Sequence, residues 1–203
     1  ASGGTLTWMV NSVTLNDSSP VNNATDSWTG PNGFASNIQN PSVGVEGQYN
    51  LVVTDPANGC TSAANAAVAL NNTPPTVSIA SPGNFNCNTN QIQLNGTGSS
   101  QGPNFVYLWS TSDGNILSGA NTLTPLIDQV GSYYLLITNG NTGCTASAAT
   151  VAAQSPAVTA AIAAQNNVSC NGAANGAAAI TPGGGNGTYS YLWSTGAITA
   201  SVS

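Results

Sequence analysis

Side chains with acid–base or metal-binding chemistry are few in this chain, and six of them are carboxylates. They are scattered rather than clustered, and the formal net charge is −6. Calcium prefers oxygen ligands, so two short loops are candidate sites: Asp55 with Asn58, and Asp113 with Asn115. Neither loop has the spacing of an EF-hand. We therefore expect the carboxylates to be solvated turn residues, with calcium binding as the alternative.

Lysine, arginine and histidine do not occur in the sequence. Nucleic-acid binding and attachment to anionic lipid headgroups both depend on basic side chains, so neither is expected. A serine or cysteine nucleophile would lack a histidine or lysine base, and zinc sites with histidine ligands are excluded. Glu46 is the one glutamate, so a pair of carboxylates that hydrolyses glycosides is not expected. The composition predicts a protein that is not an enzyme and has no cofactor beyond the candidate calcium.

The elements that must position these residues are predicted to be β-strands. Short segments rich in β-branched and aromatic residues alternate with turns rich in Gly, Asn, Pro and Ser, which is typical of sandwiches and barrels. The Ala-rich segments 62–70 and 145–153 favour helix by propensity, but each follows a cysteine-containing turn, so we expect strands. No apolar run is long enough to insert into a membrane. The other main strands are expected at 49–54, 76–80, 91–96, 105–110 and 133–138.

Landmark residues recur with a period of about 84 residues, which makes the chain an array of similar modules. Three tryptophans follow this period, and so do two tyrosines. The tryptophans fall in the middle of expected strands, where a sandwich places its central core residue. We therefore expect five core aromatic residues, which are Trp28, Trp109, Trp193, Tyr49 and Tyr133.

Three modules are predicted, at residues 1–72, 73–154 and 155–203. The first lacks a counterpart of the strand at 76–80, and the third stops after its tryptophan region. One explanation is that the chain is an excerpt of a longer array. The other is that a second copy supplies the missing strands, since open sheet edges otherwise promote aggregation.

Each module has a place for one cysteine before its second strand and one in the turn before its last strand. In the second module these are Cys87 and Cys144, and we predict a disulfide between them, worth roughly 4 kcal/mol. In the first module Trp8 takes the first place, so Cys60 has no partner there. The partner of Cys170 would lie beyond the last residue, and a Cys60–Cys170 bond would have to skip a module. Disulfide use indicates a location outside the cytoplasm.

The segment 170–203 resembles the first part of an SprB-type repeat, because a Cys-Asn-Gly start leads to a Tyr-x-Trp-Ser-x-Gly motif. The earlier modules resemble immunoglobulin-like and PKD-like modules of Bacteroidetes cell-surface adhesins, on the pieces GPNGF, GQYNLVVTDPANGCT and YLWSTSDGN. Trp8 departs from that pattern, which has cysteine there. The resemblance implies a very long adhesin that is exported by type IX secretion, acts in gliding or attachment, and carries no catalytic residue.

We therefore predict an all-β chain of tandem immunoglobulin-like or PKD-like sandwich repeats, acting as a disulfide-braced extracellular stalk at the cell surface. Its expected partners are neighbouring repeats or other copies of the chain, with surface polysaccharide as a candidate ligand. One alternative is a self-assembling fibre subunit completed by strand exchange. Another is a carbohydrate-binding accessory module of a secreted enzyme, for which Phe34 in its turn-rich loop is the candidate recognition residue.

Overall fold

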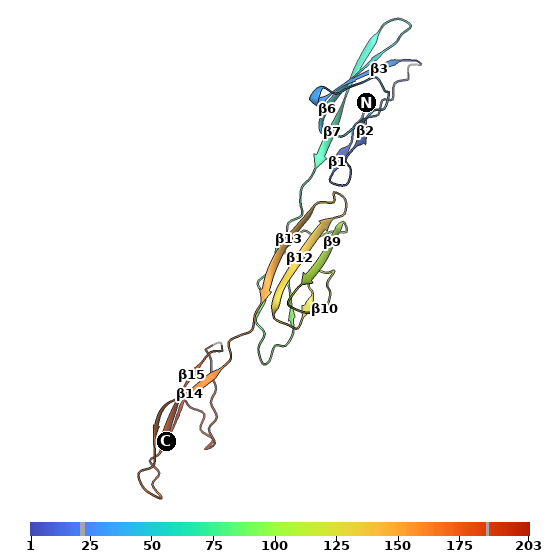
Figure 1. The fold of residues 1–203 in the computed structure, drawn as a ribbon. Coiled ribbons are helices and arrows are strands. Elements are labelled where there is room, and N and C mark those ends of the chain that lie inside the picture. The colour runs from blue at the N-terminus through green and yellow to red at the C-terminus, as the bar shows by residue number, and fades with distance from the viewer. Residues whose placement is uncertain (21–22, 186) are drawn as a thin grey trace.

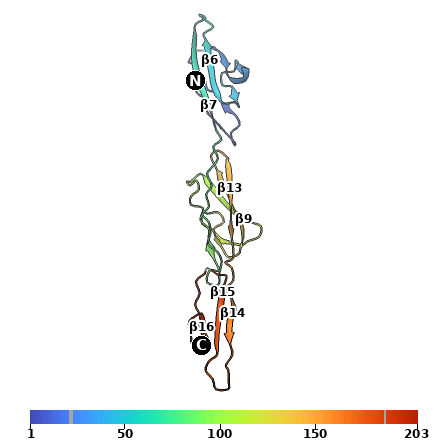
Figure 2. The ribbon, with the colours of Figure 1, turned by 90° about the vertical axis from the view of Figure 1, so that its left-hand side faces the viewer.

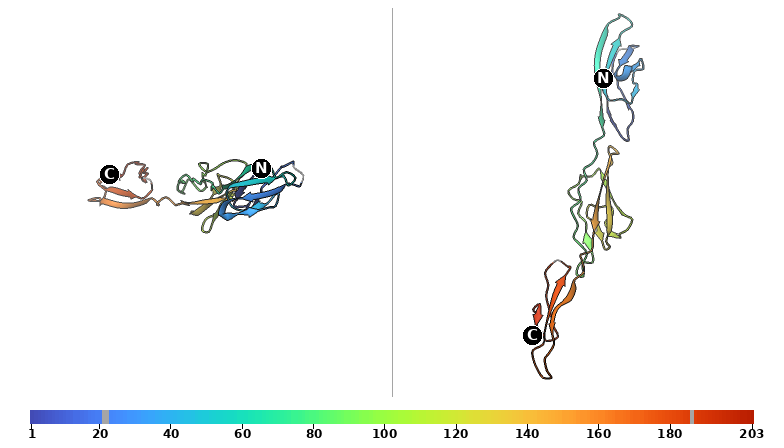
Figure 3. Two further views of the ribbon diagram at one scale, coloured as in Figure 1. Left: turned by 90° about the horizontal axis from the view of Figure 1, so that it is seen from above. Right: turned by 60° about the vertical axis from the view of Figure 1, so that its left-hand side comes forward.

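The computed structural model describes residues 1–20, 23–185 and 187–203. Its strands form three groups that follow one another along an elongated molecule (Figures 1 and 2). We name these groups the first, second and third module, with strands β1–β7, β8–β13 and β14–β16. The two chain ends lie in opposite end modules, and extended segments connect neighbouring modules (Figure 3). No helix in the described part of the chain is long and apolar enough to cross a bilayer.

The first module consists of a five-stranded sheet in the order β1-β7-β6-β3-β4 and a small sheet of β2 and β5. Strands β3, β6 and β7 pair antiparallel, whereas β1 pairs in parallel with β7. Residues of both sheets meet in one core cluster. The elements are β1 (Thr5–Thr7), β2 (Val13–Thr14), β3 (Thr25–Thr29), the 3-10 turn η1 (Pro31–Gly33), β4 (Ala35–Ser36), β5 (Ser42–Val43), β6 (Gly47–Thr54) and β7 (Thr61–Asn71).

The second module is a sandwich of two three-stranded sheets, in the orders β13-β12-β9 and β10-β11-β8. Immunoglobulin-like sandwiches place strands C, F and G in one sheet and A, B, E and D in the other. Strands β9, β12 and β13 take the places of C, F and G, while β8, β11 and β10 take those of B, E and D. The strands are β8 (Ile92–Gln93), β9 (Phe105–Thr111), β10 (Ile116–Ser118), β11 (Leu126–Ile127), β12 (Gly131–Asn139) and β13 (Thr145–Ala152).

A tyrosine near the start of the F-like strand marks both of the first two modules. The Tyr133 hydroxyl donates a hydrogen bond to the Gln129 carbonyl at 2.6 Å, and the Tyr49 hydroxyl donates one to the Val45 carbonyl at 2.8 Å. A tyrosine that bonds back to the upstream backbone is a hallmark of the immunoglobulin fold, as is a buried tryptophan on strand C, here Trp109. The prediction of tandem immunoglobulin-like sandwiches is confirmed.

Alternation of inward and outward side chains explains the long strands. On β12 the side chains of Tyr133, Leu135 and Ile137 are fully buried, and the residues between them point outward. The two Ala-rich segments are strands β7 and β13, as predicted. Each is paired along its length with a strand that carries the large core residues, and this ladder overrides the helix preference of alanine.

Two predicted strands in the second module are wrong or shorter than expected. Residues 76–80 form no regular strand, although the Ala80 N–H donates to the Asn95 carbonyl at 2.8 Å and Val77 packs against the core. Of residues 91–96 only Ile92 and Gln93 are in a strand. Past Gln93, Leu94 and Gly96 still donate to the Pro125 and Leu123 carbonyls, but Pro125 has no N–H to donate in return, so the ladder is one-sided. The turn that contains Gly96 and Gly98 interrupts the pairing of this segment with residues 76–80.

The third module is a single sheet in the order β14-β15-β16, formed by β14 (Thr159–Asn166), β15 (Ala177–Gly183) and β16 (Ser201–Val202). Every residue of β14 is exposed. Among the described residues, no member of this module belongs to either core cluster. The third module is therefore an open sheet, unlike the other two.

Candidate functional site

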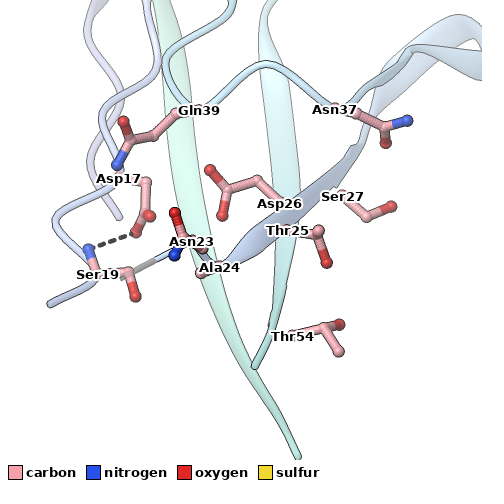
Figure 4. A pocket seen from close by; sticks show the side chains of 10 residues that line it. All are labelled: Asp17, Ser19, Asn23, Ala24, Thr25, Asp26, Ser27, Asn37, Gln39 and Thr54. Carbon is pink, nitrogen blue, oxygen red and sulfur yellow. Dashed lines mark hydrogen bonds between the residues drawn. The ribbon is translucent and has the colours of Figure 1, made fainter. Parts of the chain in front are cut away.

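A polar hollow of about 630 Å³ opens on the first module beside the start of β3 (Figure 4). Asp26 reaches it from β3, and Asp17 reaches it from the loop that follows β2. Figure 4 shows the Asp26 carboxylate turned toward the side on which Asp17 lies. The lining residues are Asp17, Ser19, Asn23, Ala24, Thr25, Asp26, Ser27, Asn37, Gln39 and Thr54.

The two carboxylates of this hollow lack part of their hydrogen bonding. Asp26 is only 9% exposed, and neither its Oδ1 atom nor Oδ2 of Asp17 has a hydrogen-bond partner among the described residues. Burial raises the pKa of the Asp26 carboxyl, and the neighbouring Asp17 raises it further. On its other oxygen, Asp17 accepts the Ser19 backbone N–H at 3.1 Å. The site is thus a pair of mutually repelling acids.

The second module explains why this hollow exists. Asp26 stands two residues before Trp28, and the matching position before Trp109 is Tyr107. The Tyr107 ring packs against the core, and its hydroxyl donates to the Ser100 carbonyl at 3.2 Å. A short carboxylate in place of a tyrosine ring leaves the space unfilled. Asp26 was not among the predicted site residues, although counting by twos from Trp28 along the strand places it on the buried face.

The chemistry available to the hollow is limited. A serine or cysteine beside the hollow would have no histidine or lysine to act as its base, because the sequence contains neither residue. In the described ranges no three or more His, Cys, Asp or Glu side chains gather to hold a metal ion. The hollow is therefore explained as a packing difference between modules.

The two loops predicted as calcium candidates use their oxygens to cap turns. Asp55 accepts the Ala57 N–H at 2.9 Å, and Asn58 accepts the Cys60 N–H at 2.8 Å. Such bonds two residues along the chain are typical of Asx turns.

The second candidate loop is likewise engaged within the protein. Asp113 accepts the Ser132 N–H at 2.8 Å, which ties the loop to the start of β12. Asn115 turns its amide nitrogen, rather than its oxygen, toward Asp128 at 2.8 Å. Both loops thus have a structural role that needs no ion.

Four of the five predicted core aromatics are buried. Trp28 and Trp109 are at most 2% exposed, and their indole N–H groups donate to backbone carbonyls. Tyr49 and Tyr133 are equally enclosed. A sugar cannot stack on rings that are covered on both faces, so these side chains provide no carbohydrate platform.

Trp193 and Phe34 differ from their predicted roles. Trp193 is half-buried, and its indole donates to the Thr199 carbonyl at 2.8 Å, so it is not a core residue of the described chain. The reason is that the described part of residues 155–203 forms β14, β15 and β16 and no further strand that covers this ring. Phe34 lies edge-on against Tyr49, with ring centroids 5.3 Å apart and an interplanar angle of 83°. This contact assigns Phe34 to packing rather than recognition.

The predicted disulfide between Cys87 and Cys144 is wrong. All four cysteines are free in the structure. Cys144 ends the turn before β13, whereas Cys87 lies just after Phe85, which bridges to Gln154 beyond the far end of β13. The eight residues of β13 span about 25 Å, and a disulfide requires Cα atoms within about 7 Å. As predicted, Cys87 precedes the strand at 92–93 and Cys144 lies in the turn before β13. The two positions, however, lie at opposite ends of the sandwich.

Solved structures of three other proteins align with parts of the chain. The three N-terminal domains of the bacteriophage RB49 highly immunogenic outer capsid protein align with a TM-score of 0.42 and 15% identity, over 77% of this chain and 57% of that one. A structure of Dscam aligns at 0.27 and 11%, over 99% and 63%. Titin domains I67–I69 align at 0.34 and 12%, over 90% and 73%. At these scores the alignments add nothing to the fold assignment, which rests on strand order and the tyrosine bonds.

The chain thus spans less than two thirds of the first two of these structures. No curated protein matches it. One family model does match, over residues 162–202, and it describes the SprB repeat. The predicted resemblance of the C-terminal segment is therefore confirmed: residues 162–202 match the SprB repeat.

Proposed function

We propose that this chain is a non-enzymatic structural segment of an extracellular surface adhesin or filament, and that it acts as a stalk. One observation carries the proposal: immunoglobulin-like modules lie end to end in an elongated molecule, and an SprB repeat forms one end of it (Figure 1). The polar groups of the described chain mainly cap turns and pair strands, which is the chemistry of a spacer.

The direction of the strands suits a segment under tension. The long strands run along the axis on which the modules are arranged (Figure 2). In the first module the strand nearest the N-terminus, β1, pairs in parallel with β7, which leads into the second module. Tension applied through the two chain ends therefore shears this pair along its length, so its hydrogen bonds carry the load together.

The finer assignment follows from the SprB repeat. We infer that the parent protein is a cell-surface adhesin that is exported by type IX secretion and used in attachment or gliding. This assignment predicts that antibodies against the chain label intact cells of the source bacterium at a distance from the membrane. Labelling that appears only after the cells are permeabilised would contradict it.

A stalk should change the reach of the adhesin and not its ligand. Removing residues 73–154 in frame from the parent protein is expected to shorten the distance between label and cell surface while the cells still attach. The matched control replaces the same residues by a flexible linker of equal residue number, which restores chain length without a folded module. Equal reach for all three proteins would count against a rigid stalk.

A second candidate, a fibre subunit completed by strand exchange, is favoured by one feature. In the second module Val77 and Ile79 of segment 76–80 pack against the core. In the first module a hollow of about 410 Å³ is bordered by Leu51 and Val53. Sedimentation equilibrium distinguishes the two: a stalk segment stays monomeric as concentration rises, whereas a fibre subunit associates, and a peptide of residues 73–82 competes with that association.

A further inference from the structure

The loop after β1 of the first module lies on the β12–β13 turn of the second. A Cβ atom added to Gly143 in that turn would lie 2.5 Å from Cγ of Met9 and 3.4 Å from Cδ1 of Trp8. Backbone and side chains are therefore in direct contact across the junction between modules. Cys144 follows Gly143 in the chain, so the contact lies next to a cysteine.

The corresponding turn of the first module is exposed. In the first module Asn58, Gly59 and Cys60 form the corresponding turn, and all three are exposed. In the second module Thr142 is 4% exposed, and Gly143 and Cys144 are half-buried. The two turns have nearly the same sequence, so the covering comes from the neighbouring module.

Trp8 occupies in the first module the place that Cys87 occupies in the second. Leu6 bridges in parallel to Leu70 at the end of β7, and Phe85 bridges in parallel to Gln154 just beyond β13. Leu6 and Phe85 are both 5% exposed core residues. Two residues further along the chain are Trp8 and Cys87, respectively.

A second register point confirms this equivalence. Leu15 donates its N–H to the Pro41 carbonyl, and Leu94 donates its N–H to the Pro125 carbonyl, each at 2.9 Å. Both leucines are fully buried. The spacing from Trp8 to Leu15 equals that from Cys87 to Leu94, so no insertion separates the two loops.

The junction between the second and third modules has a hollow beside Cys87. It measures about 430 Å³ and is bordered by residues 86–88, by the connection 154–158 and by Gly185 of the third module. Residues 155–203 contain no counterpart of the β12–β13 hairpin in their described part. The hollow therefore lies at the position that the hairpin turn fills at the first junction.

We propose that this hollow is the docking site for the cysteine-containing hairpin turn of a following repeat, and that Cys87 forms a disulfide with that cysteine. The bond joins two modules instead of closing one. Two thiols each lose a proton and together lose two electrons, and a small disulfide such as oxidised glutathione takes these up and becomes two thiols. Cys144 has no such partner here because Trp8 stands opposite it.

The first junction allows a direct test within this chain. Trp8→Cys restores a thiol opposite Cys144, and incubation with oxidised glutathione is expected to form a bond between position 8 and Cys144. Intact mass then falls by two hydrogens relative to the reduced protein, and peptide mapping after pepsin digestion identifies the linked pair. The unmodified chain is expected to form no internal disulfide under the same conditions.

Matched variants separate this pairing from chance oxidation. Trp8→Ser removes the indole without adding a thiol and should form no bond. Adding Cys144→Ser to Trp8→Cys should abolish the bond, whereas adding Cys60→Ser should leave it intact. Met9→Cys serves as the second position if Trp8→Cys loses its β-sheet circular dichroism. The proposal is overturned if the new thiol pairs only with glutathione, or with Cys60 or Cys87 as readily as with Cys144.

Cys87 itself is tested by lengthening the array. In a chain of residues 1–154 followed by a second copy of 73–154, Cys87 of the first copy should bond to Cys144 of the second copy. Cys144 of the first copy and Cys87 of the second should stay free. A bond within either copy, or a Cys87 of the first copy that stays free, would contradict the docking site.

Discussion

The tetrapeptide Tyr-Leu-Trp-Ser occurs in the second and third modules and has two different structures. In the second module it lies within β9, and its Trp109 is 2% exposed. In the third module it forms no strand, and the Trp193 carbonyl accepts the Gly196 N–H in a turn. The sequence of the tetrapeptide is the same, so the difference lies in its neighbours.

The neighbour that matters is the F-like strand. In the second module β12 pairs with β9 over seven consecutive positions, and Leu135 stands opposite Trp109. Within residues 155–203 there is no described counterpart of β12. A β-strand is therefore stabilised here by the partner strand, and the propensity of its residues is not sufficient.

Removing the tryptophan should have the largest effect and should affect one module only. Trp109→Ala removes a buried indole and leaves the Thr122 carbonyl without its partner, which should cost about 3–5 kcal/mol. Trp193→Ala should cost about 1 kcal/mol, because a half-buried indole loses one hydrogen bond to the Thr199 carbonyl. Hydrogen exchange of the β12 amides measures the first, and exchange of the β15 amides measures the second. Equal losses of stability in the two variants would contradict the conclusion that only Trp109 is a core residue.

Removing a tyrosine hydroxyl should give a smaller effect with the same asymmetry. The Tyr133 hydroxyl donates to Gln129 and accepts the Asn115 N–H at 3.1 Å, so Tyr133→Phe should cost about 1–3 kcal/mol. Tyr189 donates to the Gly184 carbonyl in an exposed setting, and Tyr189→Phe should change little. Urea unfolding followed by circular dichroism compares the midpoints. A larger shift of the unfolding midpoint for Tyr189→Phe than for Tyr133→Phe would contradict the structural role assigned to the Tyr133 hydrogen bonds.

The smallest effect should come from the position two residues before the tryptophan, which is Asp26 in the first module and Tyr107 in the second. The pKa of Asp26 is raised in the folded state, so the unfolded chain ionises at lower pH. The contribution of Asp26 to the free energy of unfolding is therefore fully present below the pKa of the unfolded chain, near 3.8. This contribution is lost as the pH rises through the pKa of the folded state.

Asp26→Asn should therefore stabilise the first module at pH 7. It should also reduce the loss of stability that the first module shows as the pH rises from 3 to 7. Thermal unfolding between pH 3 and pH 7 measures the effect, with Glu46→Gln at an exposed position as the control. If Asp26→Asn lowers the melting temperature at pH 7, the carboxylate makes a favourable interaction and the packing explanation fails.

Much of the fold was predictable because its signal is local or periodic. The alternation along β6 and β12, the matched Ala-rich strands and the buried Trp28 and Trp109 all follow from residue type and spacing. The state of Trp193 was not predictable from its motif, because it depends on strands that the motif does not contain.

The position of the cysteines shows the same limit. Spacing identified Cys87 and Cys144 as repeated positions, and this part was correct. Cys144 lies before the first residue of β13, whereas Cys87 lies near Gln154, beyond the last residue of β13. The length of β13 therefore separates the two cysteines, and this cannot be seen from their spacing in the sequence. The carboxylate hollow was missed because Asp17 and Asp26 come together only when the loop after β2 folds beside β3.

Small-angle X-ray scattering of the whole chain in solution tests the central claim, that the modules form an extended stalk. The account predicts a rod-like distance distribution and a radius of gyration well above about 17 Å, the value for a compact domain of this length. It also predicts that the distribution is the same at every protein concentration. A radius of gyration near that of a compact domain would contradict the stalk.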